Sequence, residues 1–127
     1  MQLTEDNHAS RYRITGYTSD AVQVNEDTLT GSFIISPNTL LSSWPVRSAT
    51  ALNATHWQTV LDLVPDPHLI LLGTGEHLVW PAQAVLTPLY ERQIGIEIMT
   101  TPAACRTYHL LASQGSHFVA VMIVGEG

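Results

Sequence analysis

The chain has 127 residues, 45% of them apolar and 13% charged, so it can form one hydrophobic core and lacks the charge runs typical of disordered chains. Five arginines, no lysine and eleven carboxylates give a net charge of −6. Nucleic acids and anionic membrane surfaces are held by clustered cations, so the composition excludes general binding to either and favours a protein partner or a small ligand.

The amino terminus shows no periodic apolar pattern, so we expect residues 1–10 to be flexible and residues 11–127 to form a single α/β domain. This segment is mostly polar rather than a basic stretch followed by an apolar one, so it does not resemble a secretory leader. Cys105 is the only cysteine and cannot form an intramolecular disulfide. Neither of the longest apolar runs approaches the ~20 residues of a spanning helix. We therefore expect a cytoplasmic protein without an integral membrane segment.

The first third of the chain predicts a small antiparallel β layer. Residues 11–16 and 21–24 are short alternating segments, and residues 28–36 place Leu29, Phe33 and Ile35 on one parity, as in a half-buried strand. Prolines then predict an irregular connection through Pro37 and Pro45.

A first helix is predicted after a cap at Asn53 or Thr55. Thr55 and Gln58 have the spacing of a capping box, and the Pro65-Asp66-Pro67 turn ends the helix. Residues 68–72 then form a continuous apolar run that ends at Gly73-Thr74-Gly75, the pattern of a strand covered on both faces. Residues 76–80 are compatible with either an extra strand or a turn.

The last part of the chain predicts two more helices and two more strands. A helix is expected over residues 81–92, although Pro88 lies within it, and another begins at a cap on Thr100 or Thr101 and ends at Gly115. Short apolar runs predict strands over residues 95–99 and 118–124. Strands 69–72 and 95–98 should lie side by side in parallel, with helices covering the sheet.

One candidate ligand site follows from this topology. Ligands of open α/β sheets collect beyond the carboxyl ends of the strands, where Gly73, Thr74 and Gly75 meet the start of the last helix over residues 100–106. Free backbone N–H groups, the hydroxyls of Thr100 and Thr101 and the Arg106 guanidinium together suit a carboxylate or phosphate. The alternatives are a tight turn, an ordinary threonine cap, and an Arg106 that pairs with Glu97 or a carbonyl.

Three other sets of side chains have a simpler structural interpretation beside a functional one. Cys105 and His109 are four residues apart, so a helix places them on one face, as a thiolate–imidazole pair requires. The alternative is a buried cysteine beside a surface histidine, since no third partner is evident. The six histidines show no metal-binding spacing, so we expect neither a metal nor a cofactor. The three tryptophans lie near the ends of elements and are expected to fill the core.

The chain also resembles a known family of uncharacterised domains with the Mth938-like fold, which includes mitochondrial complex I assembly factor 3 and short bacterial proteins. Four blocks between about Thr28 and Val124 carry the resemblance: Gly31-Ser32-Phe33, Leu69 to Gly75, Gly95 to Met99, and Thr101 to Tyr108. One departure is His109, where the family run usually continues with asparagine, and this weakens a fixed chemical role for that side chain.

The resemblance implies a three-layer α/β fold of β/β/α type. It has a central mixed five-stranded sheet with a small amino-terminal β layer packed on one side. It also implies a protein with no established enzymatic activity that acts through protein contacts, in a bacterial cytoplasm. We therefore expect a non-enzymatic interaction or assembly domain, linked to respiratory complexes. The alternative is a small-molecule or anion-binding domain, or an enzyme, that uses the 73–75 loop and residues 100–106, with Cys105 and Arg106 at the site.

Overall fold

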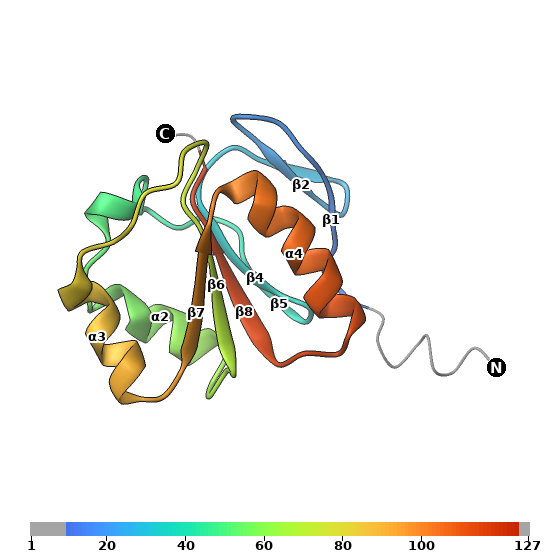
Figure 1. The fold of residues 1–127 in the computed structure, drawn as a ribbon. Helices are drawn as coiled ribbons and strands as arrows, with labels where there is room; N and C mark the ends of the chain where they lie inside the picture. Colours follow the sequence, from blue (N-terminus) through green and yellow to red (C-terminus); the bar gives the residue numbers. More distant parts are fainter. Residues whose placement is uncertain (1–9, 125–127) are drawn as a thin grey trace.

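A mixed sheet of five strands, in the order β5-β4-β8-β6-β7, forms the centre of the protein (Figure 1). The computed structural model describes residues 10–124. The strands are β4 (Phe33–Ser36), β5 (Thr39–Leu41), β6 (Leu69–Gly73), β7 (Gly95–Met99) and β8 (Phe118–Met122). β6 pairs in parallel with both β7 and β8, whereas β4 pairs antiparallel with β8 and β5. The predicted neighbourhood of strands 69–72 and 95–98 is thus confirmed.

The amino-terminal β layer is a separate three-stranded antiparallel sheet in the order β1-β2-β3. Its strands are β1 (Ile14–Tyr17), β2 (Val22–Val24) and β3 (Asp27–Leu29). Asn25 occupies the tight turn between β2 and β3 with a φ of 55°, a conformation that asparagine tolerates better than most residues. The mixed five-stranded sheet and the small β layer together confirm the predicted fold class.

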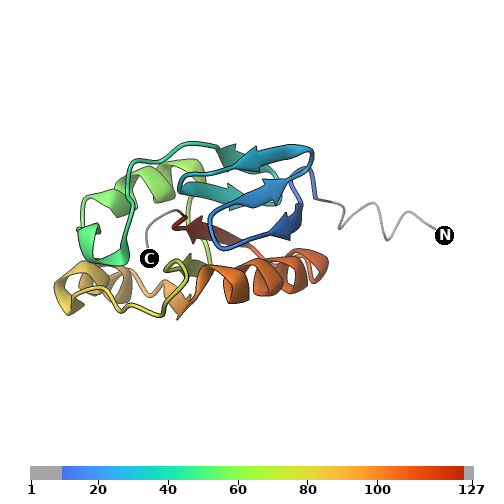
Figure 2. The same cartoon turned by 90° about the horizontal axis from the view of Figure 1, so that it is seen from above.

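The helices and the small sheet cover the two faces of the central sheet (Figure 2). The helices are α2 (His56–Leu63), α3 (Gln83–Glu91) and α4 (Thr101–Ser113), preceded by a short 3-10 helix, η1 (Ala49–Ala51). Ile70 and Leu72 of β6 face one core with α2 and α3, and Leu71 faces a second core with α4 and β2. Every residue of β6 after Leu69 is buried, as the continuous apolar run predicted.

Local signals in the sequence set the bounds of α4. The Thr100 hydroxyl accepts a hydrogen bond from the Ala103 N–H at 3.4 Å, and Pro102 lies in the first turn, where its missing N–H costs nothing. Gly115 ends the segment with a φ of 71°, which favours glycine. Of the two predicted caps, Thr100 is therefore the one that caps the helix.

The prediction of one strand over residues 28–36 is wrong. The chain leaves the small sheet after Leu29 and enters the central sheet at Phe33, so the segment forms β3 and β4 of two different sheets. Ser32 fixes this break, because its backbone oxygen accepts from Trp44 N at 2.9 Å and its hydroxyl accepts from Val124 N at 3.1 Å. The shared parity nevertheless holds, since Leu29, Phe33 and Ile35 all pack in the α4 core.

Three smaller expectations are corrected or decided by the structure. Thr55 makes no capping-box hydrogen bond, and Asn53 Oδ1 instead accepts from the Thr55 N–H at 3.0 Å. Pro37 and Asn38 form the turn between paired strands β4 and β5 rather than an irregular connection. Residues 76–80 form no strand. Flexibility was expected for residues 1–10, and of these only Ser10 lies within the described range.

Candidate functional site

The predicted rim brings together the 73–75 loop and the start of α4. The Thr101 N–H donates to the Gly75 carbonyl at 2.8 Å, and the Gly75 N–H donates back to Thr101 Oγ1 at 2.8 Å. The Thr74 N–H donates to the Met99 carbonyl at 2.9 Å, which extends the β6–β7 ladder by one bond. Gly73, Thr74, Gly75, Thr100 and Thr101 therefore lie at one edge of the sheet, where the topology predicted them.

The hydrogen-bonding groups of this rim are engaged within the chain. Thr101 Oγ1 also donates to the Ile123 carbonyl at 2.7 Å, and the Thr74 hydroxyl, which is buried, donates to the His77 carbonyl at 2.7 Å. In the first turn of α4, the Ala103 and Ala104 N–H groups donate to the hydroxyl and carbonyl of Thr100, respectively. An anion at this rim would have to displace these bonds, because proline supplies no N–H at position 102.

Gly73 is required by packing at this rim. A Cβ atom on Gly73 would lie 2.8 Å from Thr101 Oγ1, 3.0 Å from Thr101 Cα and 3.2 Å from Ala104 Cβ. The adjoining cavity between the rim and the β1–β2 turn measures about 10 Å³, room for about one water molecule. The glycine thus allows β6 and α4 to approach closely, while the ligand role assigned to this loop stays a prediction.

Cys105 and Arg106 lie apart from the rim, in a groove of about 290 Å³ between β1 and α4. The groove is lined by Ile14, Thr15, Gly16, Tyr17, Cys105, Arg106 and His109. The Arg106 guanidinium donates to the Tyr17 hydroxyl at 2.8 Å rather than pairing with Glu97 or a carbonyl. The two partners are 89 residues apart in the chain, so no local spacing could have predicted this contact.

The chemistry of Cys105 argues against a nucleophile. The side chain is buried, and burial raises the pKa of the thiol to about 12, although the nearby Arg106 opposes the shift. A thiol with this pKa stays protonated at neutral pH, whereas nucleophilic catalysis requires the thiolate. His109 is exposed on the same helix. The pair therefore fits the simpler interpretation, a buried cysteine beside a surface histidine.

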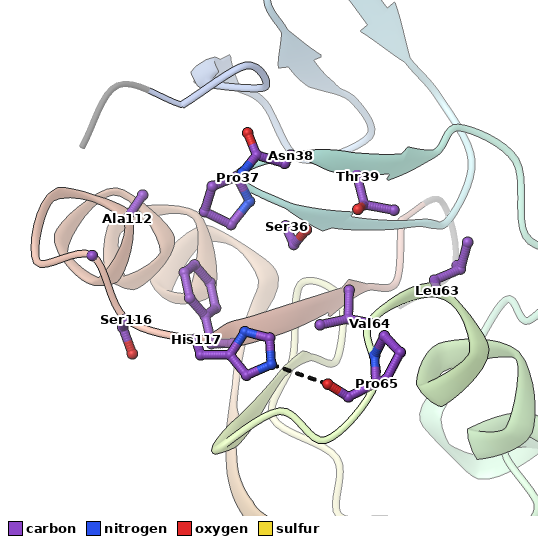
Figure 3. A pocket seen from close by; sticks show the side chains of 12 residues that line it. Ser36, Pro37, Asn38, Thr39, Leu63, Val64, Pro65, Ala112, Ser116 and His117 are labelled. Atoms are coloured by element: carbon purple, nitrogen blue, oxygen red, sulfur yellow. Dashed lines mark hydrogen bonds between the residues drawn. The ribbon is translucent and has the colours of Figure 1, made fainter. Parts of the chain in front are cut away.

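A larger pocket, of about 370 Å³, lies at the other end of the sheet and was not predicted (Figure 3). Three connections form it: the β4–β5 turn, the end of α2 with Pro65, and the loop from α4 to β8. His117 Nε2 lies 3.0 Å from the Pro65 carbonyl, and the rings of His117 and His68 meet edge to face at 5.7 Å. The turn residues Pro37, Pro65 and Gly115 were visible signals, but only the tertiary fold brings them together.

The polar groups that line this pocket do not form a catalytic set. Its side chains are apolar or neutral apart from His117, with hydroxyl and amide groups from Ser36, Asn38, Thr39 and Ser116. A general acid–base pair would need a second titratable group in the lining, and His68, whose ring packs against His117, is not one of the lining residues. Across residues 10–124, no group of three or more histidine, cysteine or carboxylate side chains is placed to hold a metal ion.

Within the same described range, no helix combines the length and the apolar character needed to cross a bilayer. The longest helix is α4, with 13 residues, and its polar residues include Arg106 and His109. The remaining described helices are shorter.

Comparison with solved structures defines the class of this domain. Its fold superposes on the solution structure of a Bordetella pertussis protein described as a Mth938-like domain, with a TM-score of 0.76 at 24% identity over 91% of this chain and 88% of that one. The solution structure of Xanthomonas campestris XCC1710 is 40% identical, with a TM-score of 0.82, over 98% of this chain and 93% of that chain. The protein is thus a three-layer Mth938-like domain.

The sequence places the chain more narrowly. Residues 14–123 match the model of a family described as protein of unknown function (DUF498/DUF598), and the chain belongs to this family. Among characterised relatives, the chain is similar to human NADH dehydrogenase [ubiquinone] 1 alpha subcomplex assembly factor 3, with 24% identity over all of this chain and 68% of the human protein. The resemblance stated from the four sequence blocks is confirmed.

Proposed function

We propose that this protein is a non-enzymatic interaction domain that assists the assembly of a respiratory NADH dehydrogenase from the cytoplasmic side of a bacterial membrane. The observation that carries the proposal is the similarity to the human assembly factor across all 127 residues of this chain. The similarity covers the whole of this domain, so we transfer to it a role that depends on the surface of the domain. The protonated, buried Cys105 agrees with a role that needs no chemistry, and so does the lining of the 370 Å³ pocket, which places no carboxylate or cysteine beside His117.

The surface of the domain also suits a protein partner. Several large apolar side chains are exposed, with exposed fractions of 54% for Leu78, 63% for Trp80, 51% for Tyr90 and 55% for Leu110. Exposed tryptophan and tyrosine side chains are enriched at protein interfaces, since they bury a large area at small entropic cost. Trp80 was expected in the core, like Trp44 and Trp57, and its exposure is better explained by a contact with another protein.

Deletion of the gene in the native host tests the proposal. We expect the deletion strain to lose assembled NADH dehydrogenase on native gels and to accumulate partial assemblies, while succinate dehydrogenase stays at its normal level. Expression of the wild-type chain should restore the complex. A deletion strain with normal amounts of assembled and active NADH dehydrogenase would contradict the proposed function.

The second candidate is a small-anion binding function, favoured by the groove that holds Arg106. One N–H of the guanidinium is bonded to Tyr17, so other N–H groups remain for a carboxylate or phosphate oxygen. A thermal-shift series with inorganic phosphate and small carboxylic acids tests it, because a ligand at 100 times its Kd stabilises by about 2.7 kcal/mol. An unchanged melting temperature throughout, or a shift equal in wild type and Arg106→Gln, would dismiss this candidate.

A further inference from the structure

Strand β7 is one of the two edges of the central sheet and the longer of them. β7 has five residues and, among the strands of residues 10–124, pairs only with β6, whereas the opposite edge, β5, has three residues. In Figure 1, β7 lies in front of the other strands, with α3 on its left and α4 on its right. An edge strand presents unpaired N–H and C=O groups, which makes it a template for a further strand.

The hydrogen-bond phase of β7 shows which backbone groups point outward. The Gly95 N–H donates to the His68 carbonyl at 3.3 Å, and the Met99 carbonyl accepts from the Thr74 N–H at 2.9 Å. In a parallel sheet, a residue directs its N–H and its C=O to the same neighbouring strand, and the next residue along the strand directs both groups to the opposite side. Gly95, Glu97 and Met99 therefore face β6. The N–H and C=O groups of Ile96 and Ile98 therefore point away from the sheet, and no backbone bond outside the regular elements of residues 10–124 involves them.

The side chains of β7 alternate between the two faces. Ile96 and Ile98 pack against the core under α2 and α3, and Met99 packs against the core under α4. Glu97 has the same parity as Met99 and is exposed. A carboxylate thus stands in the middle of the edge, between the two residues whose backbone groups are free.

This carboxylate selects the occupant. An antiparallel strand that bonds to both Ile96 and Ile98 places its middle residue directly opposite Glu97, in the close, non-hydrogen-bonded pair. If the added strand were β7 of a second copy, the opposing residue would be Glu97 itself, and like charges in that position destabilise the pairing. A cationic residue there is attracted instead, and a chain of net charge −6 has only five cations of its own to offer.

We infer that the β7 edge binds an extended segment of a partner protein as a sixth strand, with a lysine or arginine of the partner opposite Glu97. The inference rests on the proposed function, because it specifies the contact that an assembly domain would make. Backbone bonds to Ile96 and Ile98 supply the pairing, and Glu97 supplies both the preference for a basic segment and the protection against self-association.

The test uses the full ¹⁵N-labelled chain and two synthetic peptides of alternating threonine and valine, with either lysine or glutamate at the centre. We expect the lysine peptide to shift the Ile96 and Ile98 amide signals and to bind about three to ten times more tightly than the glutamate peptide. The Glu97→Lys variant should reverse this preference. Equal affinities, a preference that the variant leaves unchanged, or shifts that map elsewhere would overturn the inference.

A matched pair of variants isolates the backbone contact. Ile98→Pro and Ile98→Ala both remove the half-buried side chain, but only the proline also removes the outward N–H, and proline is tolerated on an edge strand. The lysine peptide should bind Ile98→Ala and not Ile98→Pro, with circular dichroism reporting that both are folded. Equal binding to the two variants would refute the inference. So would a wild-type dimer whose interface maps to β7.

The same variants separate this inference from the proposed function. Deletion of the gene could abolish NADH dehydrogenase assembly while Ile98→Pro restores it as well as Ile98→Ala does. This result would support the assembly function and refute the β7 contact. If deletion leaves assembly intact, the proposed function falls, and the peptide titrations decide the β7 contact by themselves.

Discussion

Replacing Gly73 with alanine tests whether the glycine of the 73–75 loop serves the packing of α4. The new Cβ would lie 3.0 Å from Thr101 Cα and 3.2 Å from Ala104 Cβ, so the start of the helix has to move away from β6. Such a shift disturbs the paired bonds between Gly75 and Thr101. Overpacking of this kind typically costs about 1–3 kcal/mol, and we expect Gly73→Ala to lose stability in that range.

Gly31→Ala is the matched control, because the same chemical change occurs there without a clash. A Cβ on Gly31 meets no atom within 4 Å, and its φ lies outside the left-handed region. Alanine restricts the unfolded chain more than glycine does, so we expect this variant to be unchanged or stabilised by up to about 1 kcal/mol. The difference between the two variants therefore isolates the contact of Gly73 with α4.

Urea denaturation followed by tryptophan fluorescence measures both variants, since Trp44 and Trp57 are buried and report on the folded core. With a slope of about 1–3 kcal/mol per molar urea, a loss of 1–3 kcal/mol lowers the midpoint by roughly 0.3 M or more. A Gly73→Ala midpoint equal to that of Gly31→Ala would refute the packing argument. The glycine would then need another explanation, with the ligand loop first among them.

Three further changes test other parts of the structure. Thr101→Val should destabilise the protein by about 2–4 kcal/mol in the same urea assay, since it leaves the Gly75 N–H and the Ile123 carbonyl unpaired, whereas Thr101→Ser should lose less. Tyr108→Phe removes a 2.6 Å bond from the hydroxyl to the Tyr12 carbonyl and should cost about 1 kcal/mol; an unchanged midpoint would count against that bond. The third change concerns Cys105, whose pKa rises from 9.0 to about 12 on folding, so the unfolded thiol loses its proton above pH 9 while the folded thiol keeps it. The free energy of unfolding should therefore fall between pH 9 and pH 12, by about 2 kcal/mol at roughly pH 10.5. The Cys105→Ala variant should lose less stability over that interval. Equal losses of stability at alkaline pH in the two proteins would contradict the buried thiol.

The elements that the sequence predicted well are those determined by local signals. The apolar run of β6, the threonine cap and first-turn proline of α4, and Gly115 at its end each act within a few residues. The break between β3 and β4 could not be predicted in this way, because Ser32 is held by Trp44 and Val124, which are distant in the sequence. The alternation across residues 28–36 therefore predicted correctly which side chains are buried. It wrongly predicted a single continuous strand.

The same distinction between local and long-range signals applies to the candidate site. The rule that loops gather at the carboxyl ends of parallel strands correctly placed Gly73 to Gly75 beside Thr100 and Thr101. The same rule placed Cys105 and Arg106 at this rim, but they line the groove between β1 and α4 instead. The contact of Arg106 with Tyr17 depends on how the small sheet packs against α4, which no motif in the sequence specifies.

A glycine-rich turn before a helix has the same sequence pattern whether it holds an anion or a neighbouring segment of the chain, because both require close approach of a backbone and available N–H groups. The two cases differ in where those N–H groups are directed. In this protein, the Thr74, Gly75 and Thr101 N–H groups bond to the chain itself and fasten α4 to the end of β6. Among residues 10–124 the outward groups of β7 have no such partners. The edge of the sheet, rather than the ends of its strands, therefore offers the unsatisfied hydrogen bonds on which recognition of another chain depends.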